Sequence, residues 1–207
     1  MLKTAPVREV QPVQSLMVRT RPVLQLTDED LFELCQQNPE LRLERTSKGE
    51  IVVMSPPGGE TSYRNARLLY QLQAWAEKDG RGVVFDSSGG FALPNGAIRS
   101  PDAAWVLRSR LAHLTPEQKQ RFLPLCPDFV AELRSPSDRL EELQAKMEEY
   151  RENGARLGWL IDPVERQVFV YRPGQSPEHH LHPNQISGDP ELPGFVLDLE
   201  RIWEPGF

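Results

Sequence analysis

The stretch "PDFVAELRS" (Pro127–Ser135) places one acidic residue inside what reads as a buried strand. Its apolar run is typical of a strand covered on both faces of a sheet, and consists of Phe129, Val130, Ala131 and Leu133. Glu132 interrupts that run. Because a carboxylate taken out of water costs several kcal/mol unless a partner compensates it, Glu132 needs a cation or hydrogen-bond donors nearby.

A second acid begins another apolar stretch, "PDAAWVL" (101–107). Two strands joined by a short helix, here predicted at "TPEQKQRF" (115–122), can place Asp102 and Glu132 at one edge of a sheet. Paired carboxylates can share a divalent cation, which would supply the missing positive charge. The alternative is that Asp102 ends a turn and Glu132 pairs with an arginine such as Arg134. The spacing leaves both interpretations open.

A helix is predicted after Glu132, from about residue 139 to residue 152. Its apolar stripe is formed by Leu140, Leu143, Met147 and Tyr150. Lys146 flanks this stripe, so its stem can lie on the core while its ammonium group reaches the end of the preceding strand. A solvated Lys146 paired with Glu149 is the alternative, and the residues alone favour it.

The rest of the chain alternates between helical and extended patterns, which predicts an α/β fold. "LRLERT" (41–46) and "IVVMS" (51–55) predict a hairpin, and residues 60–78 predict a long helix ended by Gly80. Residues 1–25 are rich in Pro, Val and Gln without a period, so we expect an N-terminal arm that pairs with another subunit. Residues 26–207 are expected to form one domain.

Composition limits the class of protein. The chain carries 24 basic and 30 acidic side chains, a formal net charge of −6, which argues against electrostatic coating of nucleic acid. Basic side chains are nevertheless in excess in segments 1–25 and 99–139. No apolar run approaches the roughly 18 residues that span a membrane. With two isolated cysteines, Cys35 and Cys126, we expect a cytoplasmic protein with reduced thiols.

Several segments together resemble a large bacterial restriction endonuclease family, a domain of unknown function within the PD-(D/E)XK nuclease superfamily. The resemblance covers about residues 25–203. The segments that carry it are "SPD" (100–102), "PDFVAELRSPSDRLEELQAKMEEYRENGARLGWLIDP" (127–163), "MSPPGGETSYRNARL" (54–68), "DSSGGFALPNGAIRSPD" (86–102) and "LPGFVLDLERIW" (192–203).

This resemblance implies a restriction-endonuclease-like α/β fold, in which helices flank a mixed β-sheet and the N-terminal arm is an appendage. Asp102 matches the aspartate of the PD element and Glu132 the acid of the (D/E)XK element. Lys146 matches a lysine moved onto the following helix, while Arg134 stands where lysine is usual. Arginine cannot act as a base, so we expect Arg134 to contact a DNA phosphate.

The resemblance also implies a cofactor and partners. Mg²⁺ or Mn²⁺ is expected between Asp102, Glu132 and the main-chain carbonyl of Leu133. Glu60 corresponds to an acid that many members carry on the first long helix, although an acid also suits a helix N-terminus without catalysis. The expected activity is DNA phosphodiester cleavage by a homodimer. The alternative is a catalytically silent module of the same fold that binds nucleic acid or a protein partner.

Overall fold

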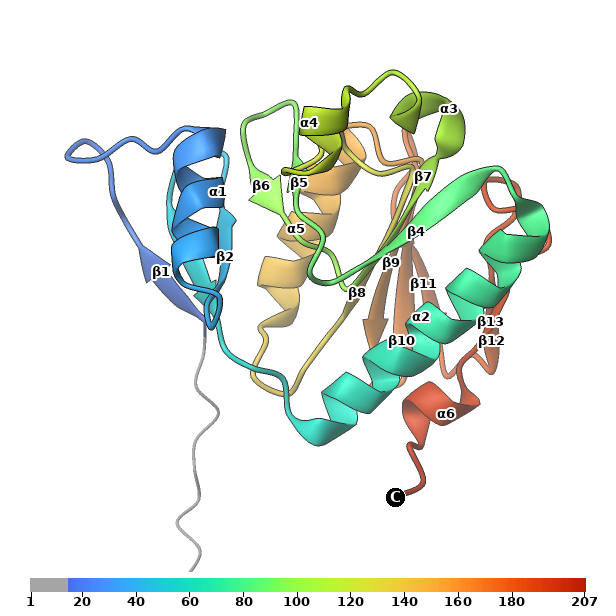
Figure 1. The fold of residues 1–207 in the computed structure, drawn as a ribbon. Helices are drawn as coiled ribbons and strands as arrows, with labels where there is room; N and C mark the ends of the chain where they lie inside the picture. Colours follow the sequence, from blue (N-terminus) through green and yellow to red (C-terminus); the bar gives the residue numbers. More distant parts are fainter. Residues whose placement is uncertain (1–14) are drawn as a thin grey trace, which may run out of the picture.

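A six-stranded mixed sheet forms the centre of the computed structural model, which describes residues 15–207 (Figure 1). Strands β8 and β9 are parallel, and the other neighbours are antiparallel. In spatial order the strands are β11 (Glu178–Leu181), β10 (Gln167–Tyr171), β9 (Leu157–Asp162), β8 (Phe129–Leu133), β7 (Ala103–Leu107) and β4 (Gly82–Asp86).

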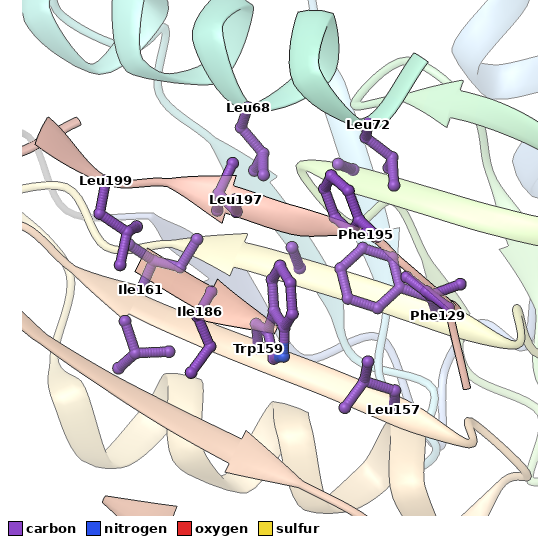
Figure 2. Packing of buried hydrophobic residues seen from close by; sticks show 14 of the residues in the cluster. Leu68, Leu72, Phe129, Leu157, Trp159, Ile161, Ile186, Phe195, Leu197 and Leu199 are labelled. Atoms are coloured by element: carbon purple, nitrogen blue, oxygen red, sulfur yellow. The ribbon is translucent and has the colours of Figure 1, made fainter. Parts of the chain in front are cut away.

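Helices cover both faces of this sheet. Helix α2 (Gly59–Asp79) lies on one face and α5 (Leu140–Glu152) on the other (Figure 1). On the α2 face, Leu68 and Leu72 of the helix belong to one buried core with Phe129 and Trp159 of the strands (Figure 2). A two-stranded ribbon, β12 (Gln185–Ser187) and β13 (Val196–Asp198), and the final helix α6 (Glu200–Trp203) complete that face.

All five residues of β8 are buried, as the apolar run predicts. Side chains alternate along a strand, so Phe129, Ala131 and Leu133 belong to the core under α2. Val130 belongs to the core under α5, and Glu132 shares its face. The sheet therefore directs Glu132 toward α5.

A second, five-stranded antiparallel sheet lies beside α5, with α1 (Asp28–Gln37) packed on it. Its strands in spatial order are β1 (Leu16–Val18), β3 (Ile51–Met54), β2 (Arg42–Arg45), β6 (Ile98–Arg99) and β5 (Phe91–Ala92). The predicted hairpin is thus β2 and β3, and Gly49 adopts the φ of +84° that its turn requires. The short helices α3 (Arg108–Leu111) and α4 (Pro116–Lys119) connect β7 to β8.

The N-terminal arm is only partly described. Residues 1–14 lie outside the described part of the chain, and β1 pairs with β3 of its own chain. The division at residue 25 therefore stays a prediction. Across residues 15–207, no helix is both long and apolar enough to cross a membrane.

Candidate active site: a buried cluster of charged side chains

Two residues of α5 compensate the buried Glu132. The Lys146 ammonium lies 2.8 Å from Oε1 of Glu132, and the Tyr150 hydroxyl donates a 2.9 Å hydrogen bond to the same oxygen. Lys146 and Tyr150 are four residues apart, so they share one face of the helix. The partner of Glu132 is therefore Lys146, and Lys146 does not form the alternative pair with Glu149.

The second sheet supplies another acid to this cluster. Glu44, on β2, lies 3.0 Å from Lys146 Nζ, so the lysine bridges two carboxylates. Glu44 also accepts hydrogen bonds from Arg99 Nη1 at 3.0 Å and from the Ser100 N–H at 2.9 Å. Its side chain is only 3% exposed. The cluster thus joins β2 and β6 of one sheet to β8 of the other through α5.

Glu149 closes the outer end of the cluster. Its carboxylate accepts a 2.6 Å hydrogen bond from Arg99 Nε and a 3.0 Å hydrogen bond from Asn95 Nδ2. Arg99 therefore lies between Glu149 and Glu44, much as Lys146 lies between Glu44 and Glu132. Acids and bases alternate along this row.

Asp102 lies at the start of β7, next to Glu132. The β7–β8 register pairs Ala103 with Ala131, which places Asp102 opposite Glu132 one step further along. Asp102 accepts hydrogen bonds from the Leu133 N–H at 2.8 Å and from Asn65 Nδ2 of α2 at 3.0 Å. The other polar atom of the Asn65 amide, Oδ1, is buried and has no hydrogen-bond partner among residues 15–207.

Burial and charge shift the pKa values of the three central acids in different directions. Burial raises the pKa of Glu132 to about 7. Lys146 lowers this pKa, but repulsion from Asp102 and Glu44 offsets much of the effect of Lys146. Burial also raises the pKa of Asp102, against the hydrogen bonds from Leu133 and Asn65. For Glu44, burial acts in the same direction, but Lys146 and Arg99 lower its pKa below the ordinary value.

The pKa of Lys146 is raised above its ordinary value. Burial alone would lower it, but the charges of Glu132 and Glu44 outweigh that effect. Lys146 is consequently a fixed positive charge in this site.

Arg134 and Glu60, which the sequence also predicted in the site, form ion pairs outside this cluster. Arg134 Nη1 lies 2.8 Å from Asp162 of the parallel neighbour β9, and its Nε donates to the Asp138 carbonyl. It is not the partner of Glu132. Glu60, at the exposed start of α2, pairs with Arg64 at 3.0 Å, and its side chain is 63% exposed. The structure therefore brings together Asp102, Glu132 and Lys146, and leaves Arg134 and Glu60 in ion pairs of their own.

The sequence did not single out Glu44, Asn65 or Tyr150. Tyr150 counted as part of the apolar stripe, although a buried tyrosine hydroxyl requires a polar partner, and that requirement was the available signal. Glu44 lies in a strand whose neighbours are set by long-range pairing. Asn65 faces Asp102 only because α2 crosses the sheet at that point.

Two comparisons place this arrangement among known proteins. A model of the Uma2 family, described as "Putative restriction endonuclease", matches residues 28–200. Among solved structures, the chain is similar to a putative nuclease belonging to DUF820 from Anabaena variabilis ATCC 29413. The TM-score is 0.71 at 20% identity, and the match covers 86% of this chain and 97% of that chain. The expected nuclease-type α/β fold is confirmed. No curated protein matches the sequence.

The raised pKa of Glu132 predicts a pH dependence of stability in metal-free protein. Between about pH 4.5 and pH 7 the unfolded chain loses the Glu132 proton while the folded chain keeps it. The stability that Glu132 contributes is therefore present below this window and lost as pH rises through it. We expect the free energy of unfolding of the wild type, relative to Glu132→Gln, to fall by roughly 3 kcal/mol across the window. Urea denaturation in EDTA at pH 5, 6 and 7 measures this, and parallel pH profiles would contradict it.

Proposed function

The chain belongs to the Uma2 family, and on that basis we propose that it is a divalent-metal-dependent endonuclease that hydrolyses DNA phosphodiester bonds. The observation that carries the proposal is the buried pair Asp102 and Glu132, whose negative charge the surrounding side chains balance only in part. Sequence similarity supports a nuclease-type hydrolase. The metal, the substrate and the residue roles are proposed from the site.

A count of charges supports a divalent cation. The cluster contains two cations: Lys146 contacts Glu44, and Arg99 contacts both Glu44 and Glu149. Lys146 also contacts Glu132, and Asp102 is the fourth acid. With two cations and four carboxylates ionised, the cluster keeps two negative charges. A divalent ion beside Asp102 would match that excess. Burial raises the pKa values of both Asp102 and Glu132, and a bound cation would oppose that shift.

Arg42 adds a further positive charge near this cluster. It acts weakly on Asp102, and its guanidinium donates to the Ser87 carbonyl. Because no ion pair joins Arg42 to Asp102 within residues 15–207, the excess charge of the two carboxylates is only partly offset.

The available donors fit Mg²⁺ or Mn²⁺. Both ions prefer oxygen ligands, usually one or two carboxylates completed by neutral oxygens and water. Asp102 and Glu132 supply the carboxylates, and the predicted Leu133 carbonyl is a neutral oxygen. Asn65 Oδ1 is a second neutral oxygen; Asn65 contacts Asp102, and its Oδ1 is buried without a partner in the described part of the chain. Residues 15–207 contain no group of three or more His, Cys, Asp and Glu side chains arranged to hold a metal ion, and the proposed site combines two carboxylates with neutral oxygens.

The side chains would divide the chemical work as follows. A bound Mg²⁺ or Mn²⁺ supplies a Lewis acid that polarises a phosphoryl oxygen and lowers the pKa of water. Lys146 places a fixed positive charge beside Glu132, where it can offset phosphate charge and orient a water. Tyr150 holds the Glu132 carboxylate in one orientation. Arg134 keeps its proposed role as a phosphate contact, restricted by its ion pair with Asp162.

We further propose a cytoplasmic homodimer that binds DNA. Strand β1 is the edge of the five-stranded sheet, and Leu16, Met17 and Val18 are all exposed on it. An unpaired edge with apolar side chains favours pairing with another strand. Cys35 and Cys126 are free thiols, in keeping with a reducing compartment.

The alternative function, a silent module that binds nucleic acid or a protein, has one observation in its favour. Lys146 already neutralises one of the two central carboxylates, as in a purely structural buried ion pair. Retention of DNA without cleavage, in the presence of bound Mn²⁺ or without it, would favour this alternative.

Metal binding gives the first test. Millimolar Mn²⁺ is expected to raise the Tm of the wild type, because the ion binds only the folded site. Asp102→Asn should abolish the rise. Glu60→Gln is the matched control and should retain it, since Glu60 pairs with Arg64 at the surface. Loss of the rise in the Glu60 variant would return Glu60 to the site, and an undiminished rise in Asp102→Asn would remove Asp102 from it.

Cleavage gives the second test. With supercoiled DNA and Mn²⁺, Lys146→Met should reduce cleavage by at least roughly 100-fold, because the charge next to Glu132 is lost. Its Mn²⁺-induced rise in Tm should remain. Arg134→Met should keep catalysis and instead weaken DNA binding or lower stability, because it leaves Asp162 buried without its partner. Full cleavage by Lys146→Met with none by Arg134→Met would reverse the two assignments.

Assembly is tested by light scattering. A homodimer should show about twice the monomer mass of 23.6 kDa at micromolar concentration. Met17→Lys, which places a charge on the exposed edge strand, should shift the mass toward the monomer. A wild-type mass of one chain at all concentrations would exclude the homodimer.

A further inference from the structure

Glu44 comes from the second sheet, yet it contacts the lysine at the centre of the proposed active site. We propose that Glu44 is a positioning residue that holds Lys146 between two carboxylates and thereby keeps Glu132 available to the metal ion. This inference rests on the proposed function. It assigns the five-stranded sheet a direct part in the active site.

Three donors fix the Glu44 carboxylate in place. Oε1 accepts from Lys146 Nζ and from the Ser100 N–H, while Oε2 accepts from Arg99 Nη1. The bond from Ser100 comes from the main chain, so it does not depend on a flexible side chain. A carboxylate held in this way is a stationary anchor for the lysine.

Backbone pairing brings this anchor to the site. β2 pairs with β6 at Arg45 and Ile98, so Glu44 lies beside the segment that continues through Arg99 and Ser100. Two residues later the same segment reaches Asp102. One short stretch of chain therefore orients Glu44 and also carries a proposed metal ligand.

The lysine is shared because its ammonium carries three N–H groups. One is directed to Glu132 at 2.8 Å and another to Glu44 at 3.0 Å. The third can meet a phosphate oxygen or a water. Without Glu44, the whole charge of Lys146 would pair with Glu132, and that pairing would compete with a cation for the same carboxylate. Glu44 thus weakens the competition and fixes the direction of the remaining N–H.

The test begins with Glu44→Gln, which keeps the shape and can still accept from Ser100. Calorimetric titration with Mn²⁺ should show affinity reduced roughly 10- to 100-fold, the usual effect of losing a residue that orients a metal site. With supercoiled DNA, kcat should fall by a similar factor while KM stays nearly unchanged. Equal Mn²⁺ affinity and equal cleavage in wild type and variant would overturn the proposal.

The variant Glu149→Gln distinguishes the position of Glu44 beside Lys146 from the total charge of the cluster. It removes the same charge from the same cluster, but Glu149 contacts Arg99 and Asn95, not Lys146. Its Mn²⁺ affinity and kcat should fall clearly less than those of Glu44→Gln. Losses as large as those of Glu44→Gln would show that only the total charge matters. Glu44→Asp retains the charge with a shorter reach, and it should lose affinity and kcat like Glu44→Gln. Wild-type behaviour of Glu44→Asp would also overturn the proposal.

A double-mutant cycle with Lys146→Met shows whether Glu44 acts through the lysine. In the Lys146→Met background, adding Glu44→Gln should cause no further loss of Mn²⁺ affinity or of residual cleavage. The double variant removes both members of the Glu44–Lys146 ion pair and leaves Glu132 with its hydrogen bond from Tyr150, so circular dichroism is recorded for every variant before titration. If the double variant instead lost Mn²⁺ affinity or cleavage by the product of the two single-variant losses, the proposal would be overturned.

The outcomes also separate this inference from the proposed function. A wild type that neither binds Mn²⁺ nor cleaves DNA overturns the proposed function and this inference together. A wild type that binds and cleaves, with Glu44→Gln and Glu149→Gln behaving alike, overturns the positioning role alone.

Discussion

The burial of Glu132 in the central sheet is the constraint on which the rest of the structure depends. A charge inside β8 is tolerable only where hydrogen bonds and an opposite charge reach it. Helix α5 provides both, through Lys146 and Tyr150 on one face. The packing of α5 on the sheet is thereby fixed in rotation as well as in position, because another orientation would leave Glu132 unpaired.

The same lysine connects the two sheets. Glu44 of β2 takes part of its charge, and Arg99 extends the row to Glu149 of α5. Strands β2 and β6 of the five-stranded sheet thus help to enclose the site. Buried ion pairs contribute little net stability, since desolvation offsets their attraction. Their effect here is to specify geometry: acids and bases alternate, and the excess negative charge remains at Asp102 and Glu132.

Sequence spacing alone does not identify the basic residue that lies beside Glu132. Arg134 follows Glu132 by two residues, in the place where the superfamily pattern has lysine. Because β9 runs parallel to β8, Asp162 lies within 2.8 Å of Arg134 and takes its charge. Lys146 is further along the sequence, but one helical face returns it to Glu132. The ammonium of Lys146 therefore bridges Glu132 and Glu44, whereas the guanidinium of Arg134 is held in its pair with Asp162.

The sequence by itself determined the local elements and the main chemical candidates. The apolar run at 129–133 defined a buried strand, Gly49 and Gly80 marked a turn and a helix end, and the motifs indicated Asp102, Glu132 and Lys146. These features depend on near neighbours in the chain or on recurring patterns. The contacts of Glu44 with Lys146 and of Asn65 with Asp102 were decided only by the tertiary structure. They join residues far apart in the chain, and they exist because sheet pairing and helix crossing bring those residues to one place.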